Sequence, residues 1–165
     1  MEAPKVRARI IVQDSDCVVA VWHATVLSVY CGPATLQHVL NISQTCRVLL
    51  EESKDPVTYV GVIERSSPAP TETVRRELAA WSRDIVTKLA VATIVAEGGG
   101  FKNALVRGVG IALTVLLPHT VPFKFSSTVE EGAALVAPSL PEISGGAPQL
   151  IAAVAEVRRR WKPAS

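Results

Sequence analysis

Three stretches of the chain are apolar at almost every position, and each is followed by a stretch of helix-forming composition. The three stretches are Val18–Val26, Val57–Ile63 and Val91–Ala96. A strand that is apolar on both faces is usually covered on both faces, so the pattern predicts a mainly parallel sheet between layers of helices. The predicted fold class is therefore α/β.

The segment before the first apolar run alternates with the two-residue period of a strand that has one solvated face. The inward set is Val6, Ala8, Ile10 and Val12, and the outward set is Arg7, Arg9, Ile11 and Gln13. Turn residues at 14–16 follow directly, which predicts an edge strand in an antiparallel hairpin with the apolar run from Cys17. With Phe123–Ser126 as the last strand, the expected sheet is mixed and has about five strands.

Helical spacing predicts the elements between the strands. The first helix is expected to begin at Pro33 and to end at about Glu51. Its apolar positions are Leu36, Val39, Leu40, Cys46 and Leu49 or Leu50. Thr71 is the expected N-cap of a second helix that reaches Leu89. On that helix the spacing places Leu78 and Ile85 toward the sheet, and Arg76 and Arg83 toward water.

Further helices are predicted in the second half of the chain. One runs from Phe101 to about Leu117, and Thr128 with Glu131 predicts a capping box for a short helix that ends at Val136. Residues 1–137 are thus expected to form the α/β domain, and 138–148 a linker rich in proline and glycine. Residues 149–165 then form an amphipathic helix with a basic end, expected to dock on the helix 101–117 or on a second subunit.

Composition narrows the classes of function. The 165 residues are 48% apolar, enough for one packed core, and the formal net charge of +2 gives no field that would attract nucleic acid. The most hydrophobic stretch, Gly108–Leu117, is too short for a membrane span. The first residues lack the pattern of a secretory signal, which predicts a cytoplasmic protein.

The cysteines and histidines predict neither a metal site nor a cofactor. The cysteines are odd in number and have no Cys-x-x-Cys spacing, so they are expected to be buried free thiols: Cys17, Cys31 and Cys46. His23, His38 and His119 share no spacing typical of metal ligands. His23 falls in an apolar run, where a core histidine is the simpler interpretation.

The order of elements resembles the STAS domain, the fold of sulphate transporters and anti-sigma-factor antagonists. The resemblance covers about residues 6–137. It rests on the opening hairpin, the three crossovers, and the segment Phe123–Ala133, which is similar to the closing strand and acidic-capped last helix of that family. It implies a protein-binding regulatory module.

In STAS antagonists the loop after the third strand carries Asp-Ser-Ser-Gly, and phosphorylation of a serine or threonine there releases the partner. The corresponding loop here reads Glu64-Arg65-Ser66-Ser67-Pro68, without the aspartate and the glycine. The resemblance makes Ser66 and Ser67 candidate phosphoacceptors. The alternative is that both are ordinary loop serines.

The loop after the strand Val91–Ala96 is a candidate site for an anion or small ligand. It joins three glycines to the first turn of the next predicted helix, and the candidate residues are Gly98, Gly99, Gly100, Lys102 and Asn103. No Walker or dinucleotide-binding pattern accompanies them, and a tight turn is the alternative.

The predicted helix 101–117 is apolar around most of its circumference. Only a narrow strip that includes Arg107, Gly110 and Thr114 is polar or small, so the helix is either buried within the chain or presented to a partner. Trp161, near the end of the terminal helix, is a further candidate interface residue.

The sequence therefore predicts a non-catalytic cytoplasmic interaction or regulatory module, whose partner is another protein or a second copy of the chain. The expected contact surface joins the loop 64–70 to the helices 71–89 and 101–117. The alternative function is a carrier of a small apolar or anionic ligand near Gly98–Asn103. An enzyme that uses Cys31 or His23 would require these side chains to converge on a cleft.

Overall fold

A six-stranded mixed sheet forms the centre of the protein. The computed structural model describes residues 7–98 and 123–161. The strands are β1 (Arg9–Gln13), β2 (Cys17–Trp22), β3 (Thr25–Tyr30), β4 (Thr58–Ile63), β5 (Val91–Ala96) and β6 (Phe123–Ser126). They lie side by side in the order of the sequence; β1, β2 and β3 are antiparallel, and β3 to β6 are parallel. The α/β class, the mixed sheet and the N-terminal hairpin are confirmed.

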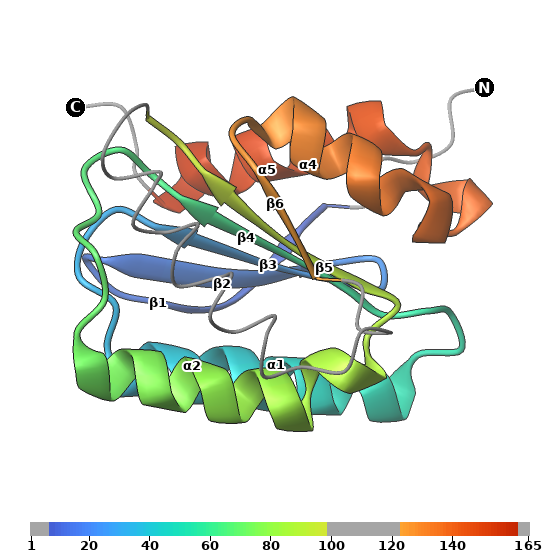
Figure 1. The fold of residues 1–165 in the computed structure, drawn as a ribbon. Coiled ribbons are helices and arrows are strands. Elements are labelled where there is room, and N and C mark those ends of the chain that lie inside the picture. The colour runs from blue at the N-terminus through green and yellow to red at the C-terminus, as the bar shows by residue number, and fades with distance from the viewer. Residues whose placement is uncertain (1–6, 99–122, 162–165) are drawn as a thin grey trace.

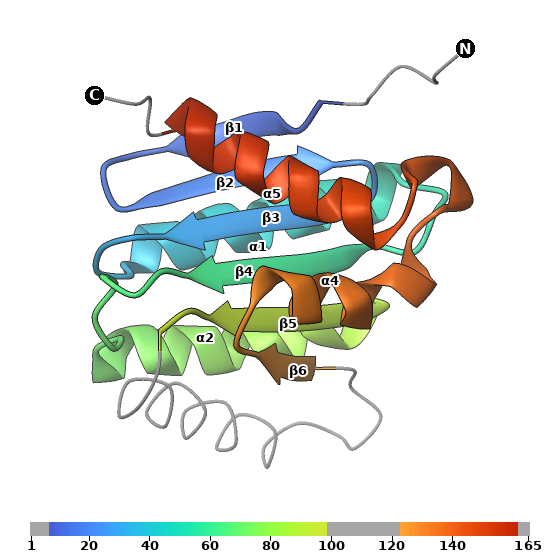
Figure 2. The ribbon, with the colours of Figure 1, turned by 90° about the horizontal axis from the view of Figure 1, so that it is seen from above.

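Helices cover both faces of this sheet, as Figures 1 and 2 show. One face carries α1 (Leu36–Glu52) and α2 (Glu72–Asp84), which continues into a 3-10 turn at Val86–Lys88. The other face carries α4 (Val129–Val136) and α5 (Ala147–Trp161), joined by the 3-10 turns Ala137–Ser139 and Glu142–Ser144. The helix predicted at 101–117 lies outside the described residues.

The sheet has one strand more than predicted, because the long apolar run from Cys17 folds back on itself. β2 and β3 are joined by the two-residue turn His23–Ala24, and Trp22 pairs with Thr25 across it. His23 has φ of 49°, in the left-handed region that tight hairpin turns need and that glycine or asparagine usually supplies. No such residue marks the turn in the sequence.

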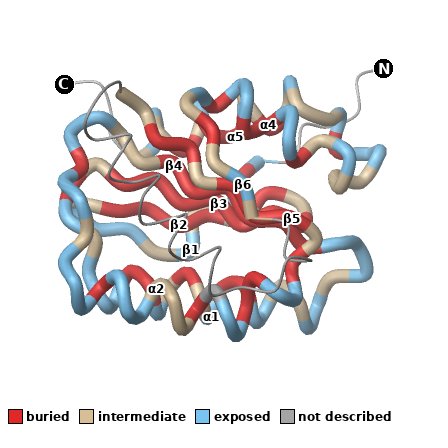
Figure 3. The backbone as a smooth tube through the Cα atoms, in the orientation of Figure 1, coloured by how far each residue is buried: buried red, intermediate tan, exposed pale blue. Residues whose placement is uncertain are grey.

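Each face of the sheet has its own apolar core, and the central strands between them are buried (Figure 3). Alternate residues of one strand contribute to different cores; Leu27 faces the α4 and α5 side, and Val26 the α1 and α2 side. On α2, Ile85 is buried and Leu78 packs against the same core, whereas Arg76 and Arg83 are exposed. The predicted orientation of α2 is confirmed.

Helix α1 begins later than predicted, and of its predicted apolar stripe Val39 and Cys46 are buried. Its N-cap is Thr35, whose hydroxyl accepts a hydrogen bond from the His38 backbone N–H, while His38 Nδ1 accepts one from the Thr35 backbone N–H. This is a capping box with histidine in place of glutamate. Leu36 and Leu40, predicted to be buried, are 42% and 57% exposed, and the buried stripe includes His38 and Ile42.

Helix α5 packs on the sheet beside α4. Leu150, Val154 and Val157 are buried in one core with residues of β2, β3 and β4, and Trp161 packs against the edge of that core. The predicted docking residues are therefore correct, and their described contacts are with the sheet and α4. The helix predicted at 101–117 lies outside the described residues, and docking on a second subunit stays a prediction. The segment predicted as a linker, 138–148, includes the end of the first 3-10 turn, the whole of the second and the start of α5.

Candidate functional site

Three of the described candidate residues, Ser66, Ser67 and Gly98, lie at the carboxyl ends of the parallel strands β4 and β5. The loops that meet there are the β1–β2 turn, the segment from Cys31 to Thr35, the loop 64–70 and the start of the loop after β5. In α/β sheets ligands usually bind at this end, in the crevice where the strand order reverses. The order of the described strands runs from β1 to β6 without a reversal, so these strands contain no such switch point.

A hydrogen bond between two side chains joins the β1–β2 turn to the start of α1. Asp14 Oδ2 lies 2.6 Å from Nε2 of the buried His38. Because Nδ1 of that ring accepts the Thr35 N–H, Nε2 carries the proton and donates to Asp14. Both ring nitrogens are thus occupied by structural hydrogen bonds, which leaves neither one available to act as a general base.

Hydrogen bonds to Asp14 also determine the pKa of its carboxyl group. Partial burial acts to raise the pKa of this carboxyl, but the hydrogen bonds that it accepts from the Asp16 N–H, the His38 ring and the Cys17 N–H outweigh burial. The pKa of Asp14 is therefore below its ordinary value.

The two candidate phosphoacceptors fasten the loop 64–70 to the loop that follows β3. The Ser66 hydroxyl donates to the Cys31 carbonyl oxygen at 2.9 Å, and the Ser67 hydroxyl donates to the Gly32 carbonyl oxygen at 2.8 Å. Ser66 is exposed and Ser67 is buried. Neither stands at the N-terminus of α2, because the N-cap of that helix is Thr71.

Glu64 and Glu97 follow β4 and β5 at equivalent positions, and Arg158 of α5 supplies the positive charge that faces them. The Arg158 guanidinium donates to both carboxylate oxygens of Glu97, and its Nε lies 3.5 Å from Glu64 Oε1. Gly98 has a φ of 101°, a conformation that favours glycine. Of the predicted anion site only Gly98 is described; Gly99, Gly100, Lys102 and Asn103 lie outside the described residues.

Of the four predicted interface residues, the structure describes only Trp161. Arg107, Gly110 and Thr114 lie outside the described residues. Trp161 is half-buried, and its indole N–H donates to the Asp14 carbonyl oxygen at 2.8 Å. The described contacts of Trp161 therefore hold the end of α5 to the β1–β2 turn.

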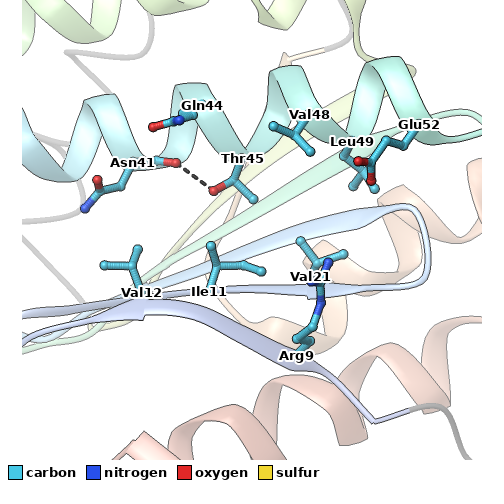
Figure 4. Close-up of a pocket in the computed structure, with 10 residues that line it drawn as sticks. All are labelled: Arg9, Ile11, Val12, Val21, Asn41, Gln44, Thr45, Val48, Leu49 and Glu52. Carbon is cyan, nitrogen blue, oxygen red and sulfur yellow. Dashed lines mark hydrogen bonds between the residues drawn. The ribbon is translucent and has the colours of Figure 1, made fainter.

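A groove that the sequence did not predict lies on the α1 face of the sheet, between α1 and the β1–β2 hairpin (Figure 4). It has a volume of about 370 Å³. Its lining residues are Arg9, Ile11, Val12 and Val21 from the hairpin and Asn41, Gln44, Thr45, Val48, Leu49 and Glu52 from α1. Ile11 and Val48 are 42% and 45% exposed, so the groove presents apolar side chains to solvent.

Topology and a bulge create this groove. Helix α1 connects β3 to β4 and contacts β3 and β2, so among the described helices none covers β1 on this face. The register of β1 on β2 shifts between Ile10 and Val12, and Ile11 occupies the bulge. A bulge at a sheet edge changes the direction in which a side chain points and interrupts the hydrogen bonds between the strands. One sequence signal was available: Ile11 is the only apolar residue in the outward set of the edge strand.

The described residues give little support for a catalytic or metal-binding role. Cys31 and His23 lie at opposite ends of the six-residue strand β3, about 20 Å apart, and do not converge on a cleft. Within residues 7–98 and 123–161, no group of three or more His, Cys, Asp and Glu side chains is arranged to hold a metal ion. No described helix has the length and apolar character needed to cross a membrane.

Comparisons of the chain with models of protein families, with curated proteins and with solved structures found no match. The resemblance to STAS domains therefore stays a prediction.

Proposed function

We propose that this protein is a non-catalytic cytoplasmic interaction module that binds a partner protein in the groove between α1 and the β1–β2 hairpin. The observation that carries the proposal is the pair of exposed apolar side chains, Ile11 and Val48, which line this groove from opposite walls. Contiguous apolar surface rimmed by polar residues is typical of binding sites. The surface that the sequence predicted around the loop 64–70 is a different one, and it stays a prediction.

The partner segment that fits best is an amphipathic helix. The groove runs between a helix and the face of a sheet, and a helix laid there would extend the α1–α2 layer by one element. Its apolar face would contact Ile11 and Val48, and its polar face would meet Gln44 and Glu52 on the rim. A strand added to the edge of β1 is disfavoured because the bulge at Ile11 interrupts the ladder.

The cysteines support a reducing compartment. Cys17, Cys31 and Cys46 are free thiols; Cys17 and Cys46 are buried as predicted, whereas Cys31 is only half-buried. Burial raises the pKa of both Cys17 and Cys46 to about 12. Such groups stay protonated at neutral pH and react slowly, which suits a structural role in the cytoplasm.

A charge placed in the groove tests the proposal. Val48→Glu should leave the fold intact, because Val48 is exposed, and should reduce recovery of the specific partner from native cells at least 10-fold. Leu135→Glu, a matched change at an exposed position of α4 on the opposite face, should leave recovery unchanged. Equal recovery by wild type and both variants, with unchanged melting temperatures, would refute the groove as the binding site.

A further inference from the structure

Two charged residues are found among the described residues that line the partner groove, which is the groove between α1 and the β1–β2 hairpin. Arg9 lies on the hairpin wall, and Glu52, the last residue of α1, lies on the helix wall. Figure 4 shows both toward the same end of the groove, whereas Asn41 and Gln44 lie toward the other end. The two walls therefore carry opposite charges at one end only.

Neither charge is paired within the part of the chain that the structure describes. Arg7 and Arg160 both pair with Glu156, at 2.9 Å and 3.7 Å. By contrast, no hydrogen bond or ion pair joins the side chain of Arg9 or of Glu52 to another described residue. Both side chains are exposed, so they are available to the charged groups of a bound protein.

The end of α1 adds to the negative charge of the helix wall. Glu51 and Glu52 both lie in its last turn, which contains no basic residue. The C-terminus of a helix carries the negative end of the helix dipole, where cations are favoured and carboxylates are not. The helix wall therefore attracts a cation at this end of the groove.

The hairpin wall presents the opposite charge on a strand of the sheet. Arg9 stands opposite Val21 in the paired strands β1 and β2. A guanidinium group binds a carboxylate through two parallel N–H···O bonds, and arginine is enriched among the residues that dominate the energy of protein interfaces. An acidic side chain of the bound segment therefore matches this wall.

We propose that the partner helix has an acidic residue that pairs with Arg9 and a basic residue that pairs with Glu52, on opposite flanks of its apolar face. Ile11 and Val48 contact the apolar face between these two charges. The inference rests on the proposed function, to which it adds the charge pattern of the partner.

The two charges also select the direction in which the helix binds. A helix inserted in the reverse direction would place both of its charged residues beside Asn41 and Gln44, and it would lose both ion pairs. Complementary charges at an interface act mainly on specificity and register, which is the role assigned to this end of the groove.

Charge reversal in the intact protein tests the pattern. Arg9→Glu and Glu52→Lys should each reduce recovery of the partner from native cells by about five-fold or more, because each replaces an attraction by a repulsion. The double variant keeps the net charge of the wild type but exchanges the charges of the two walls, so its recovery should stay low. Restored recovery in the double variant would mean that only net charge matters, and it would overturn the proposal.

Matched controls separate this inference from the proposed function. Arg75→Glu and Glu77→Lys, at exposed positions of α2, should leave recovery unchanged. If Val48→Glu abolishes recovery while Arg9→Glu and Glu52→Lys retain it, the groove binds a partner but the charge pattern is refuted. If Val48→Glu also retains it, the proposed function itself fails.

Zero-length crosslinking identifies the residue that pairs with Arg9. Arg9→Lys keeps the positive charge and supplies an amine, which a carbodiimide couples to a carboxylate in direct contact. Mass spectrometry should find position 9 joined to an aspartate or glutamate beside the apolar face of one partner helix, and Lys124, exposed on β6, should not be joined to that helix. Position 9 joined only to Glu52 of the same chain would show that the two walls neutralise each other, and it would overturn the proposal.

Discussion

The carboxylate of Asp14 lies 2.6 Å from the ring of His38, and this pair joins the first turn of the sheet to the first turn of α1. Asp14 Oδ1 also accepts the backbone N–H groups of Asp16 and Cys17. One side chain therefore orders the hairpin that forms one wall of the groove and holds it against the helix that forms the other.

Asp14→Asn should destabilise the protein by about 1–2 kcal/mol at pH 7, because an amide N–H would face the His38 Nε2–H. The pKa of Asp14 is lowered by folding, so its stabilisation is present above its unfolded pKa near 4 and is lost as the pH falls through the lower folded value. Urea denaturation at pH 7 and at acid pH measures both effects. Asp55→Asn, on an exposed turn, is the control. If the loss of stability caused by Asp14→Asn stays constant down to pH 2, the result contradicts a stabilising role of the Asp14 charge.

The α2 face should be sensitive to truncation of its buried residues. Ile85→Ala should cost about 2–5 kcal/mol because the side chain is buried, whereas Arg83→Ala should cost less than about 1 kcal/mol. Chemical denaturation of the two variants measures the difference. Equal losses would mean that the helix presents a different face to the sheet.

Helix α5 should behave as part of the core. Leu150→Ala removes a fully buried side chain and should cost about 2–5 kcal/mol, while Gln149→Ala, next to it on the helix, should cost less than about 1 kcal/mol. The melting temperature and the cooperativity of unfolding report the outcome. A protein that unfolds identically after Leu150→Ala would have an α5 that is independent of the sheet.

The two loop serines should respond differently to a negative charge. Ser67→Asp places a carboxylate in a buried position, facing the Gly32 carbonyl oxygen, and should destabilise the protein by more than about 2 kcal/mol. Ser66→Asp, at an exposed position, should cost less than about 1 kcal/mol. Thermal unfolding of both variants tests this; if Ser67→Asp is tolerated, the loop can open, and Ser67 then becomes accessible to a kinase.

Elements that depend on local periodicity could be predicted from the sequence. The amphipathic stripe of α2 and the cap at Thr128 each depend on neighbouring residues, and each agrees with the structure. The alternation in β1 was only partly correct, because the bulge at Ile11 places Ile10 and Val12, predicted to share one face, in different cores. The turn at His23 could not be predicted, because it places a histidine in the left-handed region without a glycine or asparagine.

Features that depend on how distant segments pack together could not be predicted from the sequence. The partner groove exists because α1 covers β2 and β3 and leaves β1 open on that face. This arrangement cannot be predicted from any single segment of the sequence. The docking residues of α5 followed from their spacing, but their surroundings did not, since the sheet surface that receives them is assembled from several strands.

Site-specific photo-crosslinking tests the central claim most directly. A photoreactive residue is placed at Gln44, which is exposed on the groove wall, and in a matched protein at Arg75, which is exposed on α2. After irradiation in native cells, mass spectrometry of the adducts should show one dominant crosslink from position 44, to the polar face of an amphipathic helix in a partner, and none from position 75. No adduct at position 44, or the same adducts from both positions, would contradict the proposal that this groove binds a partner helix.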